Sequence, residues 1–534
     1  MNNSIRFFSL FAPDSEQKYF RLNDNTINDL SIDFLALNLA ETTDEQSRLK
    51  QMLYNMPVSR DIIEYRQEIY KDLKDFPDVC NELCEIFDRM NFYTQENIRN
   101  LNEKSSIWEL VARLRSLQNY VDSVSQLQKL LKDKNFTSRG MKTLYEHIER
   151  IHSEGGFSEL EKDLEAIGED VNSIHSMTLG VNFDSNFFPH EVGILSLNNY
   201  YFGEKGMLER FFKFHKKGNS EDTDLTPFTM LTHPKVLSAD TSPLMNNLTR
   251  LVEQMLPTAT KKILRVLKKY TDISASAIAG CADELMFYIR FINLEKKLTE
   301  NNLPCCMPEF SDNDTVFSDV YNVKLAIHSI NNVAENATVC NDLHFTKDDN
   351  ILILTGPNRG GKTIITQGIG LAVLMFQLGV FVPCRSGKIK LCDGIYTHFP
   401  ADENQTVTLG RLGEESERFS NICKTASSDS LLLFNESFAT TSHNESLYIA
   451  EDVIKYLTCL GARACFNTHL HELAENIESL SCDKSICGCA SVVMGKRDSE
   501  NAYKISYEKP DGKSYAHSIA YQYGITLDQL LENI

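Results

Sequence analysis

A run of glycines, a lysine and a threonine follows an apolar stretch in the second half of the chain. Residues 355–363 read TGPNRGGKT between an apolar strand candidate, 351–354, and an apolar helix candidate. Backbone N–H groups of such a loop and helix start point at phosphate oxygens. Lysine here reaches the β- and γ-phosphates, and threonine ligates Mg²⁺. The alternative is a glycine turn inside a hydrophobic core. Such a turn does not require a strand before it and a helix after it. The expected ligands are ATP and Mg²⁺, and the expected binding residues are Gly356, Pro357, Asn358, Arg359, Gly360, Gly361, Lys362 and Thr363.

An acidic residue that ends a second apolar stretch is the candidate for activating water. Residues 431–434 read LLLF and run into Asn435 and Glu436. Glu436 can orient or deprotonate the water that attacks the γ-phosphate. Asn435 stands where an acidic residue normally supports the metal, and its amide adds no charge to a cation that prefers carboxylates. We expect Thr363, Asn435 and Glu436 around Mg²⁺.

A third apolar stretch ends close to a histidine. Residues 464–467 lead into THLHE, in which the first histidine is His469. At the end of a strand, His469 would sense the γ-phosphate or position water. The alternative is a histidine that caps an element or fills the core. The residues alone do not separate these two interpretations.

The elements around these residues alternate as they do in an α/β domain. From about residue 345 onward, helical segments separate the strand candidates, as expected for a sheet covered on both faces. A fourth strand candidate is 490–494. Up to about residue 340 the pattern is mostly that of long helices. There Thr43-Asp-Glu-Gln46 matches a capping box, and 176–202 is patterned like strands.

Length and composition are typical of a soluble protein of several domains. The chain has 534 residues, of which 42% are hydrophobic and 24% charged, and one core rarely serves so many residues. No apolar run reaches the roughly 20 residues that span a bilayer, and the N-terminus lacks the features of a signal peptide. We expect a cytoplasmic protein without a membrane segment. The 14 cysteines are scattered, and without two closely spaced pairs they indicate structural thiols, not a metal site.

Charge weighs against simple binding of nucleic acid. The formal net charge is −20, whereas non-specific binding requires cations that neutralise phosphates. A basic and aromatic segment, RFFKFHKK at 210–217, holds the candidate DNA contacts Arg210, Lys213, Lys216 and Lys217. The alternative is a solvated loop flanked by core aromatics. A second basic face at 261–269 is more typical of an exposed helix.

Three segments together resemble the MutS family of DNA mismatch-repair ATPases. They are TGPNRGGKT, LLLFNESFATTS and NTHLHEL, in this order and spacing. The resemblance continues through 381–383, 393–397, 402–404 and 512–520 and so covers nearly all of 340–534. In the helical part, LKQMLYNMPVSRDIIEYRQEIYKDL, with Arg66, is the best match to the family's core and lever region.

The resemblance implies an ABC-type nucleotide-binding domain that dimerises around ATP, with long lever helices that carry a DNA clamp. It makes Glu436 the catalytic carboxylate and His469 the switch histidine. Residues 437–442 would lie at the dimer interface. The phosphates and Mg²⁺ would be held by Gly356, Asn358, Gly361, Lys362 and Thr363.

The chain also departs from the family's full-length repair proteins. Those begin with a mismatch-reading domain, which carries a Phe-x-Glu wedge, and a connector domain. Core-like helices begin here by about residue 28, so we expect neither domain. Asn435 replaces the usual Asp, which argues against fast hydrolysis. Residues 408–415 lack a plain match to the serine-bearing segment that touches ATP across the dimer, and the usual C-terminal dimerisation tail is expected to be truncated or absent.

The predicted fold is mixed, with a long-helix core and lever region followed by an α/β P-loop ATPase domain of the ABC type. We expect a helical core over 1–105, lever helices over 106–340 with a clamp-like insertion near 176–202, and the ATPase domain over 341–534. The predicted function is ATP-dependent binding of duplex or branched DNA by a homodimer, with hydrolysis coupled to a clamp and without wedge-type mismatch reading. Two alternatives stay open: an ATP-gated clamp or scaffold without hydrolysis, and an ABC-type ATPase with a protein client.

Overall fold

The computed structural model describes most of the chain. It covers residues 9–13, 18–94, 107–172, 176–186, 189–198, 257–270, 276–332, 338–357, 360–400, 411–439, 441–495, 502–510 and 527–531. Two compact units emerge from the contacts within the chain. Unit 1 combines Met1–Cys80, Phe136–Thr143 and Cys281–Ile534, and unit 2 combines Asn81–Asn135 and Leu144–Gly280. Three of the four boundaries between the units lie within helices, which are α5 (Pro77–Thr94), α7 (Arg139–Ser153) and α12 (Ser276–Glu300).

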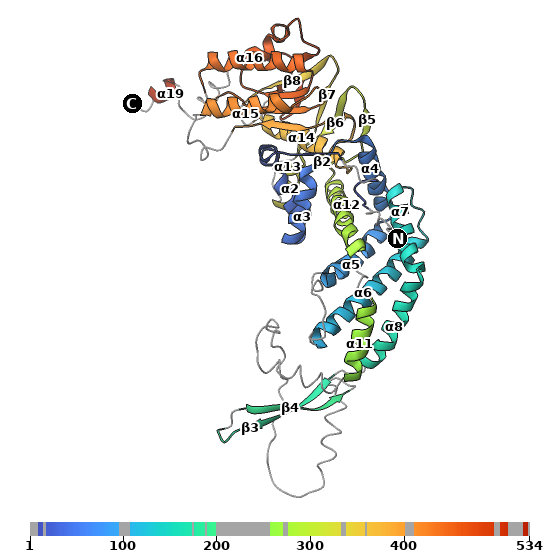
Figure 1. Cartoon of the computed structure of the whole chain (residues 1–534). Coiled ribbons are helices and arrows are strands. Elements are labelled where there is room, and N and C mark those ends of the chain that lie inside the picture. The colour runs from blue at the N-terminus through green and yellow to red at the C-terminus, as the bar shows by residue number, and fades with distance from the viewer. Residues whose placement is uncertain are drawn as a thin grey trace, which may run out of the picture. The chain divides into compact units, whose positions relative to one another are not determined.

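A six-stranded sheet lies in unit 1, and its strand β8 is labelled in Figure 1. Its first five strands run parallel and its last is antiparallel. The four stretches predicted as strands are confirmed in it. In sheet order the strands are β10 (Ile395–His398), β11 (Leu431–Asn435), β12 (Arg463–Asn467), β8 (Asp349–Thr355), β13 (Gly488–Met494) and β14 (Ile505–Ser506).

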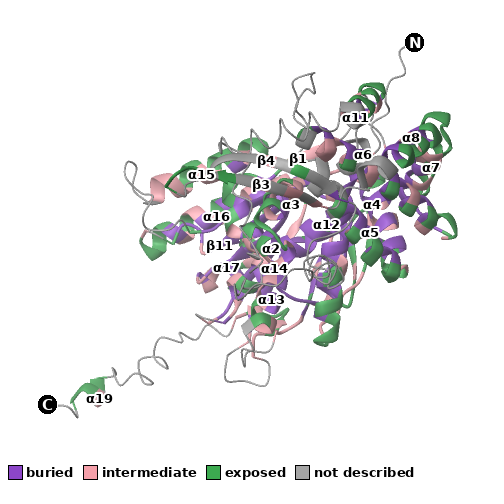
Figure 2. Ribbon diagram, turned by 90° about the horizontal axis from the view of Figure 1, so that it is seen from below, coloured by how far each residue is buried: buried purple, intermediate pink, exposed green. Residues whose placement is uncertain are grey.

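Helices cover both faces of this sheet, as predicted. Alternate side chains of a strand point to opposite faces, so Leu432 and Phe434 of β11 join the core cluster that includes α16 (His443–Leu460). Leu433 faces α14 (Lys362–Gln377), where a Cβ on Gly370 would overlap it. Strands buried on both sides explain the unbroken apolar runs in the sequence. The burial of β11 and α14 is visible in Figure 2.

A second, four-stranded sheet lies within the same unit. Its order is β5 (Glu309–Ser311), β9 (Ser386–Lys390), β6 (Thr315–Val320) and β7 (Asn341–Phe345). Two of these strands, at 309–320, fall where the sequence predicted long helices, and for these residues that prediction was wrong. The strands are short, and pairing with β9, some 70 positions further along the chain, is what stabilises them.

Short helices and a two-stranded ribbon form the N-terminal part of unit 1. They are β1 (Tyr19–Arg21), α1 (Asp24–Asp29), α2 (Ile32–Leu39), α3 (Thr43–Tyr54), β2 (Asn55–Pro57) and α4 (Arg60–Asp75). The N-cap of α3 is Thr42, whose hydroxyl accepts the Glu45 N–H. The predicted box was therefore wrong by one residue, because two adjacent threonines offer the same chemistry. Glu45 accepts in turn from the backbone of Glu41.

Arg66 on α4 ties this part to the end of α14. Only 2% of Arg66 is exposed, and its guanidinium donates to Phe11 O at 2.9 Å and to the Tyr19 hydroxyl at 3.2 Å. It also lies over the Phe11 ring, 4.2 Å from the centroid. Directly after α14, Gly379 approaches so closely that an added Cβ would lie 2.3 Å from Arg66 Cβ. The buried guanidinium thus finds carbonyl, hydroxyl and aromatic partners.

Unit 2 is built on helices with a hairpin inserted between them. The helices α6 (Ile107–Lys132), α8 (Gly155–Asn172) and α11 (Pro257–Lys269) contact one another. The predicted strands appear as the antiparallel pair β3 (Ser176–Phe183) and β4 (Pro189–Asn198). Residues 210–217, with the predicted DNA contacts, lie outside the described residues.

The remaining elements complete unit 1. They are α13 (Val323–Asn332), α15 (Arg411–Thr425), α17 (His471–Glu475), the 3₁₀ helix η1 (Ile477–Leu480) and α19 (Leu527–Leu531). No helix in the described part of the chain is long and apolar enough to cross a bilayer.

The contact between Gly379 and Arg66 predicts a large loss of stability for Gly379→Ala. The φ of Gly379 is +78°, a left-handed conformation that costs about 1–2 kcal/mol for other residues, and overlap with a packed neighbour adds about 1–3 kcal/mol. We expect a destabilisation of at least about 2 kcal/mol, measured as a fall in the unfolding midpoint. Gly156→Ala is the matched control, since a Cβ there meets nothing within 4 Å. Equal midpoints for the two variants would contradict this account.

Candidate functional site

The predicted phosphate loop lies between β8 and α14. Gly356 follows β8 with φ +141°, and Gly361 precedes α14 with φ +91°. Both values suit glycine, and a Cβ on Gly356 would lie 2.8 Å from Met494 Cβ. The loop therefore needs glycine at both ends. Two of the predicted residues, Asn358 and Arg359, lie outside the described part of the chain.

Lys362, the first residue of α14, folds back over the loop. Its Nζ donates to Gly356 O at 3.1 Å and to Pro357 O at 3.2 Å. Burial lowers the pKa of Lys362 to about 8, and the nearby carboxylate of Glu436 opposes this. The ammonium group thus lies beside the N-terminal end of α14, where backbone N–H groups attract anions. A phosphate bound here would supply the negative counter-charge that stabilises the protonated form of the buried lysine.

Two amides and a hydroxyl meet where β11 and β12 end. The strands pair in a register that sets Asn435 opposite Asn467. The Thr363 hydroxyl donates to Asn435 Oδ1 at 2.8 Å, and Asn467 Nδ2 donates to the same oxygen. The structure therefore brings Thr363 and Asn435, two of the expected Mg²⁺ residues, together and adds Asn467, which the sequence did not single out. A polar residue at the end of a buried strand was the available signal.

Glu436 and His469 form the other contact of the site. Glu436 Oε1 lies 2.7 Å from His469 Nε2, and this hydrogen bond lowers the pKa of Glu436. The Glu436 N–H also donates to Asn467 O at 2.8 Å. His469 thus extends toward the carboxylate, an arrangement that the first of its two interpretations requires. Both residues are about one-third exposed, with 37% of each side chain accessible.

These residues fit a magnesium ion bound together with a nucleotide. The donors that surround the site are a hydroxyl, an amide oxygen and one carboxylate, all of which are hard oxygen ligands. Mg²⁺ usually takes one or two protein oxygens and completes its shell with water and phosphate. Among the described residues no cluster of three or more His, Cys, Asp or Glu side chains forms a metal site by itself. The phosphates of a nucleotide would have to supply the remaining ligands.

The turn after Glu436 is held in an uncommon conformation. Glu436 has φ +49° and Phe438 has φ +62°, which for residues other than glycine costs about 1–3 kcal/mol each. The Glu415 carboxylate on α15 accepts the Phe438 N–H at 2.7 Å. Within the stretch 437–442, Ser437 and Phe438 are buried inside the chain, so their side chains are not free to contact a second subunit.

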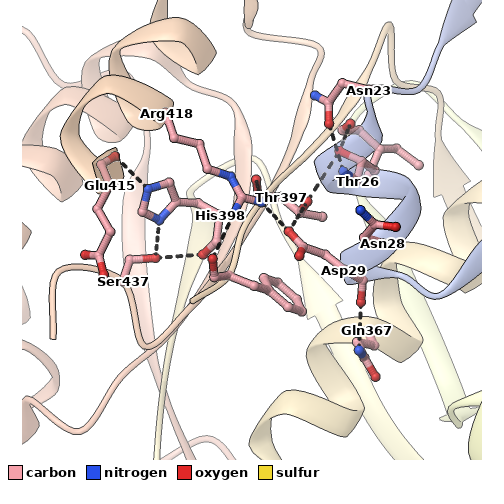
Figure 3. A network of polar contacts seen from close by, with 12 residues as sticks. Asn23, Thr26, Asn28, Asp29, Gln367, Thr397, His398, Glu415, Arg418 and Ser437 are labelled. Carbon is pink, nitrogen blue, oxygen red and sulfur yellow. Dashed lines mark hydrogen bonds and ion pairs between the residues drawn. The ribbon is translucent and has the colours of Figure 1, made fainter. Parts of the chain in front are cut away.

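His398 bonds to Glu415 and to Ser437 of the same turn, as Figure 3 shows. Its Nε2 lies 2.9 Å from Glu415 O, and its Nδ1 lies 2.7 Å from the Ser437 hydroxyl. A carbonyl only accepts, so the neutral ring carries its proton on Nε2. The Ser437 hydroxyl also donates to His398 O at 2.8 Å, so its single proton is shared between that carbonyl and the unprotonated Nδ1. Neither His398 nor Glu415 was singled out as a site residue, because they lie at least 35 and 20 positions from the residues whose chemistry stood out.

An ion pair fastens α15 to the N-terminal helices (Figure 3). Arg418 on α15 pairs with Asp29 at the end of α1, and both side chains are mostly buried. Thr397 donates to Asp29 Oδ2 at 2.6 Å. Gln367 on α14 donates to Asp29 O at 2.7 Å. Burial raises the pKa of Asp29, and the Arg418 guanidinium opposes this. Asp29 therefore contacts both α14, which carries Lys362, and α15, which carries Glu415.

Burial of His398 predicts an acid-sensitive step in stability. Desolvation lowers its pKa to about 4, below the ordinary value near 6.5, so the folded protein takes up the proton later than the unfolded chain. Above about pH 6.5 His398 is neutral in both the folded and the unfolded protein, so it does not change the free energy of unfolding. As pH falls toward 4, only the unfolded chain takes up the proton, and the folded protein loses stability. One pKa unit corresponds to about 1.4 kcal/mol, so we expect a loss approaching about 3 kcal/mol.

His398→Gln removes this titration and should flatten the pH dependence of the unfolding midpoint between about pH 6.5 and 4. His443→Gln is the control, because His443 is exposed and pairs with Glu472 at the surface. The account is wrong if His398→Gln loses stability as steeply with falling pH as the wild type does.

Two models of known protein families match this chain, one in its N-terminal part and one in its C-terminal part. The family model described as MutS domain V, a P-loop ATPase domain, matches residues 352–528. The model described as the MutS2 N-terminal domain matches residues 58–301. Together the two matches take in most of the chain.

Individual relatives carry the same names. A DNA mismatch repair protein MutS of Acetivibrio thermocellus is 36% identical over 185 residues, 34% of this chain and 21% of that protein. Its counterpart in Chlorobium chlorochromatii is 38% identical over 148 residues, 28% of this chain and 17% of that protein. An Endonuclease MutS2 of Caldicellulosiruptor bescii is 30% identical over 200 residues, 35% of this chain and 25% of that protein.

The aligned part of this chain thus spans between 17% and 25% of the length of these relatives. The matched residues include the second half of β8, the phosphate loop, β11 and β12, which are the elements that position Lys362, Glu436 and His469. From the two family models and the relatives together, the chain belongs to the MutS family.

Proposed function

We propose that the chain is an ATP-dependent DNA-binding protein that hydrolyses ATP. The observation that carries this proposal is the convergence of three contacts at one edge of the sheet. They are Lys362 on the loop carbonyls, Thr363 on Asn435, and His469 on Glu436. The names of the relatives, which describe DNA mismatch repair and an endonuclease, support DNA as the client.

Each residue has a task that follows from its position. Lys362 leaves the carbonyls of Gly356 and Pro357 and binds the β- and γ-phosphates, whose charge restores its ordinary pKa. Glu436 is ionised, because His469 lowers its pKa, and it accepts a proton from the attacking water. His469 then keeps the carboxylate oriented and senses the γ-phosphate. Bound Mg²⁺ would neutralise charge on the β- and γ-phosphates, with Thr363 and Asn435 as its protein-side contacts.

The neutral amide of Asn435 supports slow turnover. Thr363 and Asn467 both donate to Asn435 Oδ1. An aspartate at position 435 would therefore keep both hydrogen bonds. Charge is the only loss at this position, and charge is what a hard cation requires. A protein in which ATP binding alone sets the state, with negligible hydrolysis, is therefore the main alternative.

The proposal includes a homodimer that closes around ATP through the domain that carries the phosphate loop. The helices of unit 2 would act as levers, and the hairpin of β3 and β4 would belong to a reduced clamp. Contacts to DNA would be made to phosphates and not to base edges, so duplexes with and without a mismatch would bind alike. Arg210, Lys213, Lys216 and Lys217 remain candidates for these contacts.

Turnover by purified protein tests the catalytic assignment. Glu436→Gln should lower the rate of ATP hydrolysis by at least about 100-fold and leave ATP binding intact, because the amide keeps the shape of the side chain. Lys362→Ala should weaken ATP binding itself. Loss of binding in Glu436→Gln, or unchanged turnover, would contradict the assignment.

The Asn435→Asp variant distinguishes a slow ATPase from a protein that binds ATP without hydrolysing it. It should raise turnover and lower the Mg²⁺ concentration needed for half-maximal rate, since a carboxylate replaces a neutral amide. Asn467→Asp is the matched control, because it changes the same pair but removes the donor to Asn435. If the wild type and Asn435→Asp both bind ATP without hydrolysing it, the non-hydrolysing alternative holds.

DNA binding is tested with homoduplex, single-mismatch and four-way-junction DNA, each with and without ATP, over a salt series. We expect nucleotide-dependent binding that weakens steeply with salt, with equal affinity for mismatch and homoduplex. Tighter binding to the mismatch would refute the phosphate-only contact. No binding at low salt would refute DNA as the client and favour a protein partner, which the net charge of −20 would suit.

A further inference from the structure

Two pairs of cysteine thiols lie almost in contact, and the proposed function uses neither pair. None of the 14 cysteines is joined in a disulfide. The Sγ atoms of Cys459 and Cys482 are 3.3 Å apart, and those of Cys306 and Cys384 are 3.4 Å apart. A disulfide has an S–S length near 2.05 Å, so either pair could be joined after a small rotation of the side chains.

The two pairs differ in access to solvent. Cys482 is exposed and Cys459 is half-buried. In the other pair Cys384 is buried, and Cys306 lies in a backbone bridge with Val382. A dissolved oxidant must reach a sulfur atom before a bond can form. Access therefore favours the pair of Cys459 and Cys482.

The surroundings of Cys482 also favour its thiolate. The backbone N–H of Lys484 and the Ser485 hydroxyl, 3.6 Å from Sγ, both lower the pKa of Cys482. The hydrogen bond to Cys482 raises the pKa of Cys459. Burial raises the pKa of the neighbouring Cys487 to about 11, which leaves that thiol protonated. Cys482 is thus the nucleophile that meets the oxidant, and Cys459 is the thiol that can attack Cys482 after oxidation.

Backbone contacts hold the two cysteines together before any bond forms. Cys459 is near the end of α16, and Cys482 is in the segment after η1. The Ile486 N–H donates to Thr458 O at 2.9 Å, and the hydroxyls of Thr458 and Ser485 lie 2.7 Å apart. Little chain entropy remains to be lost on closure, because the segment is already attached to the helix end.

We propose that Cys459 and Cys482 form a reversible disulfide when the protein meets a peroxide. The Cys482 thiolate attacks one peroxide oxygen, the O–O bond breaks, and the departing hydroxide takes a proton to become water. Cys482 is then a sulfenic acid. The Cys459 sulfur attacks the Cys482 sulfur, its proton leaves with the hydroxyl as a second water, and the S–S bond forms. Two thiols lose two electrons, and the peroxide gains them.

The bond would enclose the segment that carries His469. The two cysteines are 23 positions apart, and β12, His469, α17 and η1 lie between them. At the other end of α16, His443 pairs with Glu472 of α17 at 2.9 Å. Oxidation would therefore fix both ends of α16 to the segment after β12. This inference does not depend on ATP hydrolysis or DNA binding.

The test uses the full chain, first reduced and then treated with hydrogen peroxide at increasing ratios. Free thiols are blocked with an alkylating reagent, and peptides are mapped without reduction by mass spectrometry. We expect the peptide that links Cys459 to Cys482 to appear first and to vanish with dithiothreitol. The Cys306–Cys384 link, from thiols at a similar separation, should form at least ten times more slowly.

Two serine variants identify the roles of the thiols. In Cys459→Ser, Cys482 should stop at the sulfenic acid, which a 1,3-diketone probe traps. In Cys482→Ser, Cys459 should stay reduced at the same peroxide ratio. The oxidised wild type should melt a few degrees above the reduced protein, and neither variant should show this shift. Equal rates for the two pairs, or a bond from Cys482 to Cys487 instead, would overturn the proposal.

Discussion

The site depends on the register of three parallel strands. Leu354 at the end of β8 is opposite Asn467 at the end of β12, and Asn467 is opposite Asn435 at the end of β11. Parallel strands end at the same edge of a sheet, so the three segments that follow them meet there. A slip of one residue would turn Asn435 to the other face of the sheet. The side chains of Leu432 and Leu433, on opposite faces, are both buried in the observed register.

The helix after the phosphate loop carries this constraint into the rest of unit 1. Lys362 begins α14, and Arg66 contacts the chain at its end, where Leu378 O lies 3.5 Å from the guanidinium. Between them Gln367 holds Asp29. The helix is buried along most of its length. N-terminal helices that are remote in sequence are thus part of the same packed body as the candidate site.

The turn that presents Glu436 shows how the chain maintains an uncommon backbone conformation. Two left-handed residues, Glu436 and Phe438, are unfavourable by themselves. The Glu415 carboxylate and the His398 ring hold the turn from one side, and the Glu436 N–H bonds to β12 from the other. Because α15 carries Glu415 and is fastened by Arg418 to Asp29, the orientation of the carboxylate depends on the N-terminal helices.

The sequence by itself determined the parts of the protein that rest on local chemistry. The glycines of the loop, the four apolar strand stretches and the pair of residues after 431–434 each carry their signal within a few neighbouring residues, because phosphate binding and burial on both faces restrict the residue types. The family resemblance of these segments is confirmed by the family models. The strands of 309–320 carried no such signal, because short strands depend on distant partners.

Only the tertiary structure decided which distant residues meet. Asn467 bonds Asn435, His398 and Glu415 hold the turn, Arg418 pairs with Asp29, and Cys459 lies against Cys482. Each of these contacts joins residues that are tens to hundreds of positions apart. A polar or thiol side chain in one segment does not specify its partner in another, because the strand register and helix packing that bring them together arise from the whole core.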